Sequence, residues 1–355
     1  MGWVSALISQ RTFRVWGIAT ILVVAMAALA GGIAFGTTTT CNNPATLSGS
    51  AFEIDPNANL VVTTSGCQDW LTGGTGFRSG VVAKNDTPSG SGDESFGEGT
   101  KEDTALPTVV DGSIPPNKSD LKAFGVYTEQ GTATASNPTG KFLALFWTRV
   151  QDPSGTTNMD FELNQKHCGS GPTFTNCAPN HITPLRTSGD KLITYDLARG
   201  GTVATISIRT WNGSAWGPAT VISGGANPNA LGSVNTSLIP ANQAGGATNG
   251  LTAALGSLDP RTFGEASISF SALLGSSTCG SFGSAYLKSR SSDSFTAALK
   301  DFVPPTQVSI SNCSALSTNA SNPAASPATI GSSISDTATL SGVTPTAGGT
   351  ITFKA

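Results

Sequence analysis

Acidic and amide side chains gather in one loop-rich stretch, just before an expected strand over 123–128. Carboxylate and amide oxygens are the ligands that calcium, a hard cation, takes in proteins. The spacing is not that of an EF-hand loop, and the alternative is that these side chains cap turns while Lys101 and Lys118 neutralise the carboxylates. The stretch is therefore a candidate calcium site, with the ligands Glu102, Asp103, Asn117 and Asp120.

A second group of polar side chains alternates along the expected strand 158–165. Asp160, Glu162 and Asn164 share one face of it, because the pleat puts alternate residues on the same side, about 6.6 Å apart. They could hold a shared ion or a polar ligand. The residues between them are apolar, so we interpret the strand as half buried, with these three side chains on a solvated outer face.

Two tryptophans flank a turn signal. The Asn212-Gly213 pair supplies the two positive-φ positions of a type I′ turn, which predicts a hairpin with Trp211 and Trp216 on opposite arms. If the two indoles are exposed, they form a platform on which a sugar ring could lie. The alternative is a cross-strand aromatic pair that closes the hairpin and fixes its register.

One Gly/Pro/Asn-rich loop carries two histidines and two cysteines within fifteen residues, a ligand set that zinc accepts. A loop pinned by a single disulfide explains the same residues in an exported protein, and we adopt that interpretation. The four residues are His167, Cys168, Cys177 and His181.

The sequence lacks the parts that catalysis needs. Glycoside hydrolysis requires two carboxyl groups facing each other across a cleft, and nothing indicates a cleft. A Gly-x-Ser-x-Gly elbow and a phosphate-binding Gly-Lys-Ser/Thr loop are both missing, and the only two histidines belong to the cysteine loop. With 19 Lys+Arg against 22 Asp+Glu, the chain is also not basic enough for nucleic acid. We predict a protein that is not an enzyme and has no nucleic-acid partner.

The first 30 residues read as a signal peptide. Arg11 and Arg14 precede an apolar stretch over 15–35, and Ala28-Leu29-Ala30 has the small residues that a signal peptidase reads. Cleavage after Ala30 is the prediction. The alternative is that the segment, to about residue 35, stays as a membrane anchor, because it is long enough to cross a hydrocarbon core of about 30 Å.

Export places the six cysteines in an oxidising compartment, where disulfides form. Six cysteines allow fifteen connectivities. Closeness in sequence favours three local loops, each worth about 2 to 4 kcal/mol of stability. The predicted pairs are Cys41–Cys67, Cys168–Cys177 and Cys279–Cys313.

Short apolar and β-branched runs recur between turn signals, which predicts an all-β antiparallel sandwich. In 142–147 both alternate faces are apolar, so this strand is expected at the centre of a sheet and covered on both sides. The run 294–302 has apolar residues at helical spacing before Pro304-Pro305, which predicts two helical turns. The expected strands are 59–64, 124–128, 141–150, 158–165, 191–197, 202–211 and 265–274.

Changes in composition divide the chain. The two strand-like runs 334–342 and 348–354 are too few to bury a core, so the sequence reads as a piece of a longer protein. The expected parts are a signal peptide over 1–30, a linker over 31–46, a β-sandwich module over 47–313, a linker over 314–328, and the truncated start of an Ig-like repeat over 329–355.

Seven segments carry a family resemblance: LSGSAFEID at 47–55, GTKED at 99–103, GSIPPNKSDL at 112–121, LITYDL at 192–197, FGEA at 263–266, KSRSS at 288–292 and KDF at 300–302. Together they resemble the N-terminal module of large exported bacterial surface proteins that carry Ig-like or prealbumin-like repeats. The resemblance covers roughly residues 47–313. It implies a jelly-roll-like sandwich on the cell surface, and it implies no ligand and no catalytic residue.

These observations predict a secreted or cell-surface bacterial protein, with a non-catalytic adhesion or display module at the head of Ig-like repeats. Its partner would be the cell envelope or an extracellular ligand, with a glycan as one option, and only the N-terminal segment would meet a membrane. The alternative function is a carbohydrate-binding module stabilised by calcium. No other cofactor is expected.

Overall fold

The computed structural model describes residues 41, 43, 45–88, 90, 92–152, 154–166, 177, 183–275, 279–313, 315–320, 335–341 and 351. The predicted signal peptide and most of the linker 31–46 therefore lie outside the described residues.

Among the residues that the structure describes, no helix has both the length and the apolar character needed to span a bilayer.

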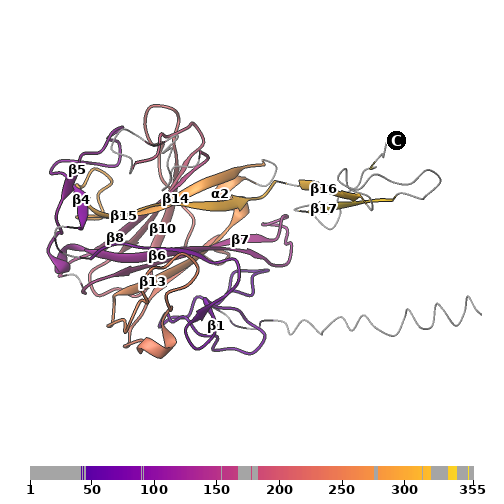
Figure 1. Ribbon diagram of the computed structural model, residues 1–355, viewed down its shortest axis with the longest axis horizontal. Coiled ribbons are helices and arrows are strands. Elements are labelled where there is room, and N and C mark those ends of the chain that lie inside the picture. Colours follow the sequence, from indigo (N-terminus) through magenta and orange to yellow (C-terminus); the bar gives the residue numbers. More distant parts are fainter. Residues whose placement is uncertain are drawn as a thin grey trace, which may run out of the picture. The chain divides into compact units, whose positions relative to one another are not determined.

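Two antiparallel sheets form the body of the protein and lie as separate layers (Figure 1). The larger sheet has the strand order β11-β10-β9-β8-β14-β15-β4-β5, and the smaller has the order β12-β13-β7-β6-β3. The larger sheet consists of β4 (Glu94–Phe96), β5 (Val109–Asp111), β8 (Thr157–Asn164), β9 (Lys191–Leu197), β10 (Thr205–Thr210), β11 (Thr220–Val221), β14 (Ser281–Arg290) and β15 (Leu299–Ser311). The smaller consists of β3 (Val82–Asn85), β6 (Leu121–Gln130), β7 (Lys141–Arg149), β12 (Ala230–Val234) and β13 (Phe263–Ser269).

The inner faces of the two sheets share one hydrophobic cluster, which confirms the all-β, antiparallel prediction. Phe161 of β8 packs against Phe124 of β6, with ring centroids 6.3 Å apart. Tyr195 of β9 packs edge-on against Trp147 of β7 and donates its hydroxyl to the carbonyl of Ser233 on β12. Alternate residues of each strand thus fill the space between the layers, as in a β-sandwich.

The outer face of the smaller sheet is covered as well. Residues 52–83, with the small hairpin β1 (Leu71–Gly73) and β2 (Gly76–Phe77), join residues 239–258 in a second hydrophobic cluster over β7 and β13. Trp70 packs edge-on against Phe146 at 4.8 Å. β7 is central in its sheet and buried on both faces, as its sequence predicts.

Two glycines make room for the aromatic side chains of β7. Gly264 lies directly opposite Trp147, and a Cβ there would be 2.3 Å from the indole. Gly125 lies directly opposite Phe146, and a Cβ there would be 2.1 Å from the ring. The rings therefore lie across the neighbouring strands, where any side chain at these positions would collide with them.

The predicted helix over 294–302 is wrong. Residues from Leu299 onward form β15, the longest strand, and the described helices are short: α2 (Phe270–Leu274) and two 3-10 turns, Pro116–Lys118 and Ala241–Gln243. Pro304 and Pro305 lie inside β15, where its pairing with β14 shifts register between Val303 and Thr306. Such an irregularity tolerates residues that have no N–H to donate, so the prolines bend the strand without ending it.

A separate two-stranded sheet follows the sandwich. β16 (Ala315–Ala320) pairs antiparallel with β17 (Asp336–Ser341), and Leu316 lies opposite Leu340. Residues 315–320, which were expected to belong to a linker, are therefore a strand. Of the expected strand 348–354, only residue 351 is described. The expected strand 59–64 is a loop.

Two of the three predicted disulfides are confirmed. Cys41 is bonded to Cys67 and Cys279 to Cys313, with Cα–Cα distances of 4.5 and 4.7 Å. Cys177 is also disulfide-bonded, but Cys168 lies outside the described residues. Cys279 precedes β14 and Cys313 follows β15, so their bond closes the open end of that strand pair.

Removing this second bond should cost about 3 to 4 kcal/mol of stability, because it closes a loop of 34 residues in the unfolded chain. The test is urea unfolding of the Cys279→Ser/Cys313→Ser variant against the oxidised parent. The matched Cys41→Ser/Cys67→Ser variant, with a separation of 26, should lose nearly as much, since the loop term depends only weakly on length. A loss below about 1 kcal/mol in both variants would contradict this account.

Candidate functional site

The polar face of β8 is buried, contrary to the prediction of a solvated surface. Asp160, Glu162 and Asn164 are each 0% exposed. β14 lies beside β8 and places Lys288 opposite Asp160 and Tyr286 opposite Glu162. Positive charge on the neighbouring strand allows this acidic face to be covered, because buried carboxylates need charged or hydrogen-bonding partners.

Glu162 is the centre of this network. Arg186 donates from Nε and Nη2 to its two oxygens, each at 2.9 Å, as a bidentate pair. Lys288 Nζ at 2.9 Å and the Tyr286 hydroxyl at 3.0 Å donate to Oε2, and the amide of Asn164 donates to Oε1. Burial opposes ionisation here, but Arg186 and Lys288 outweigh it and hold the pKa of Glu162 well below its ordinary value.

A second buried ion pair continues the network along the same sheet. Arg290 donates from Nε and Nη2 to the carboxylate of Asp160, and from Nη2 to Asp196 at 2.7 Å. Its Nη1 donates to the carbonyls of residues 292, 293 and 294. Asp160 and Glu162, the two acids of this strand face, are therefore each paired with a cation of the protein itself.

The four predicted calcium ligands do not come together. Glu102 is buried and contacts Lys288, while Asp103 is exposed and accepts the backbone N–H of Trp216. Asn117 is exposed in a 3-10 turn, and Asp120 is buried elsewhere. Glu102 and Asp103 lie over β8 instead of in a shared loop, because Arg186 and the Trp216 indole both donate to the carbonyl of Glu102.

Trp211 and Trp216 are a buried pair and not a platform. They are 5% and 6% exposed, and their rings meet edge-on at 5.3 Å. The guanidinium of Arg186 lies 5.0 Å from both ring centroids. The two residues form an antiparallel bridge, as the hairpin predicts, but four residues connect them, and Asn212 binds the backbone N–H groups of Ser214 and Ala215. Neither indole offers a face to a ligand.

The possible zinc ligands His167, Cys168 and His181 lie outside the described residues.

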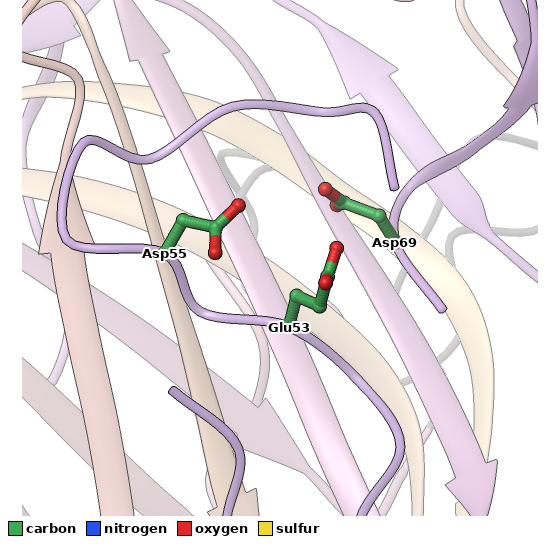
Figure 2. A group of neighbouring side chains, drawn as sticks. All are labelled: Glu53, Asp55 and Asp69. Carbon is green, nitrogen blue, oxygen red and sulfur yellow. The ribbon is translucent and has the colours of Figure 1, made fainter. Parts of the chain in front are cut away.

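Three carboxylates that were not predicted as a group converge beneath the N-terminal loop. Figure 2 shows Glu53 and Asp55, from one segment, and Asp69, from another, pointing toward one another. One oxygen of each lies within 4.8 Å of the others. Nearby groups already bind these acids: the backbone N–H groups of Thr63 and Thr64 donate to Glu53, and the amides of 43 and 59 donate to Asp55.

A second such group, Asp86, Asp93 and Asp301, lies where the two sheets meet, again with one oxygen of each within 4.8 Å of the others. Asp86 follows β3, Asp93 precedes β4, and Asp301 is on β15. Burial, followed by mutual repulsion, raises the pKa of Asp301 to about 9 and that of Asp86 to about 8. In the sequence, each of these aspartates stands at or near the end of a strand. That these strand ends are neighbours becomes visible only once the strand pairing is known.

Three surface hollows, of about 470, 210 and 300 Å³, lie on the described part of the chain. The largest is lined mainly by small and apolar residues, including the exposed Val203 and Val221. None of these three hollows has an aromatic side chain in its lining.

Comparison of the chain with protein-family models, with curated proteins and with solved structures finds no match in any of the three.

Replacing Lys288 with methionine should cost about 3 to 5 kcal/mol, because it leaves Glu102 and part of Glu162 buried without their cation. Adding Glu102→Gln should recover at least about 1 kcal/mol, since the charge left unpaired is then removed. Urea unfolding of both single variants and the double variant measures this coupling. Lys101→Met, at an exposed lysine, is the control. Additive effects of the two substitutions would refute the network.

Glu265 predicts a pH dependence. Burial, followed by repulsion from Asp69, raises the pKa of Glu265 well above its ordinary value, while its Oε2 accepts the indole N–H of Trp70 at 2.9 Å. As the pH rises above about 4.5, the unfolded chain releases this proton and the folded chain keeps it, so folding loses stability.

Glu265→Gln keeps an acceptor for the indole and removes the proton. Its stability relative to the parent should therefore rise with pH, by up to about 1.4 kcal/mol per pH unit above pH 5. Urea unfolding between pH 5 and 8 is the measurement, and Glu98→Gln at an exposed position should show no such trend. If the free energies of unfolding of Glu265→Gln and of the parent change equally with pH, Glu265 is already ionised in the folded protein.

Proposed function

We propose that the chain is an exported, non-catalytic adhesion or display module of a bacterial surface protein. The observation that carries the proposal is the position of the two confirmed disulfides along the chain, one before the first strand and one directly before β16. Cys41 is bonded to Cys67 close to where the chain enters the body. Cys313 is bonded to Cys279 immediately before β16. Disulfides persist in oxidising compartments, so they support a location outside the cytoplasm.

The position of these bonds suits a module that is loaded at its ends. A pull on the chain beyond residue 313 would peel β15 from β14, starting at Ser311 and Ser281, which are paired. The bond between Cys279 and Cys313 lies just beyond that pair and blocks the separation. Modules in series on a cell surface carry such a load between anchor and ligand.

We extend the proposal to the topology of the sandwich, the strands that follow it and the N-terminal segment. A jelly-roll-like topology, an Ig-like repeat beginning with β16 and β17, and an export segment over 1–30 fit a module placed at the outer end of a surface protein. The in-register pairing of Ala315–Ala320 with Asp336–Ser341 supports a second β unit after the sandwich. The partner would be an extracellular ligand or the cell envelope, with the N-terminal segment as the sole membrane contact.

The carbohydrate-binding alternative has less support. Its predicted platform, Trp211 and Trp216, is buried around Arg186, and the three described hollows have no aromatic lining. Sugar recognition relies on exposed rings that stack on the apolar faces of sugars. We therefore assign binding to the loops at the ends and edges of the sandwich.

The test is to express the full chain with its native N-terminal segment and to label intact bacterial cells. An antibody against the sandwich should label unbroken cells, and a thiol reagent should modify no cysteine until a reductant is added. Retention inside the cell with reactive thiols would overturn the proposal. A glycan array tests the alternative: specific glycan binding by the folded, oxidised chain would replace display with sugar recognition.

A further inference from the structure

The group around Asp301 contains more acid than the three residues first described. Asp120 immediately precedes β6, and its neighbour Leu121 donates its backbone N–H to Asp301 Oδ2 at 2.7 Å. Asp120 repels the carboxylates of Asp86, Asp93 and Asp301, so it lies near this group, which comes from the ends of β3 and β4 and from β15. Asp120 is thus a fourth acid beside the three whose oxygens lie within 4.8 Å of one another.

Three of these acids, Asp86, Asp120 and Asp301, have buried oxygens without a partner among the described residues. Asp120 is 0% exposed, and neither of its carboxylate oxygens has a hydrogen-bond donor among the described residues. Asp301 is also 0% exposed, and its Oδ1 has none, as is true of Asp86 Oδ2. Four buried oxygens without a donor contrast with Glu162, which has five donors.

Within the described part of the chain, no cationic side chain pairs with Asp86, Asp120 or Asp301. Of the salt bridges between described residues, none involves Asp86, Asp120 or Asp301. Lys122, which is close in sequence, donates its Nζ to the carbonyl of Leu255. A buried carboxylate without a counter-charge costs several kcal/mol, and bound cations are one of the ways in which proteins remove that cost.

We propose that Asp86, Asp93, Asp120 and Asp301 bind one calcium ion. Calcium takes six to eight oxygens at about 2.3 to 2.6 Å, so oxygens on opposite sides of it lie up to about 5 Å apart. One oxygen each of Asp86, Asp93 and Asp301 lies within 4.8 Å of the others, so one calcium ion can reach all three. Calcium accepts several carboxylates in a flexible shell, whereas magnesium demands near-octahedral geometry and keeps several waters. Asp86 is only half-buried and gives the ion its entry from solvent.

The ion would tie the two layers together at a weak place. β4 and β5 are three residues long and form the edge of the larger sheet, while β3 forms the edge of the smaller. Asp93 and Asp301 belong to the first sheet, and Asp86 and Asp120 to the second. The site is independent of the display proposal, because it stands on the carboxylates alone.

The test uses the full chain, freed of metal with a chelator and then titrated with calcium chloride. Calorimetry should show one bound ion per chain, native mass spectrometry should count the same ion, and the melting temperature should rise by several degrees. Magnesium at the same concentration should give at least tenfold weaker binding. No calcium binding, or no selectivity over magnesium, would overturn the proposal.

Asp120→Asn/Asp301→Asn keeps the shapes of the side chains and removes two charges. This variant should bind calcium at least tenfold more weakly, and without metal it should melt above the metal-free parent, because repulsion has been relieved.

Two single variants serve as controls and should respond to calcium like the parent: Asp103→Asn, which is exposed and outside the group, and Asp55→Asn, which is in the other acidic group. Calcium binding that survives in the double variant, or disappears in Asp55→Asn, would place the ion elsewhere. If the double variant fails to fold, Asp86→Asn, at the half-buried position, replaces it and should likewise weaken calcium binding.

Discussion

Burial of charge between covered strands is the constraint on which the rest of this structure depends. β8 is buried along its whole length, with an apolar face toward the other sheet and an acidic face beneath the loops. That acidic face is stable only because Lys288 and Arg290 on β14 and Arg186 from a loop reach it. The loop that contains Glu102 and the Trp211–Trp216 pair are held over β8 by the same arginine. One network therefore fixes both a strand pair and the segments that cover it.

Two groups of buried acids in this chain differ in their partners. Glu162 and Asp160 are each paired with a cationic side chain, so their negative charge is balanced within the protein. At the junction of the sheets, Asp86, Asp120 and Asp301 form no salt bridge within the described part of the chain, and each has a buried oxygen without a donor there. Burying carboxylates close together without a counter-charge is costly. Such an arrangement is understandable if an ion from outside completes it.

Failures of the sequence analysis share a physical origin. The run 294–302 has helical spacing, but Leu299 and Phe302 pack with Phe96 under the edge of the larger sheet, and tertiary packing outweighs a short helical pattern. The alternation in 158–165 was read correctly as two faces, yet its polar face is covered. Calcium ligands were expected among residues close in sequence, and of the four named only Asp120 lies near the group of Asp86, Asp93 and Asp301. That group draws its members from positions 86 to 301, which become neighbours only through strand pairing.

Taken alone, the sequence determined the all-β class, the central position of β7 and two disulfides. Each of these follows from local information: the type of residue on alternate positions, the apolar character of both faces, and the short distance between cysteines along the chain. Tertiary structure decided which faces are covered, which charges are paired and which tryptophans are hidden. Alternation says toward which side a residue points, but what lies on that side depends on contacts between residues far apart in the chain.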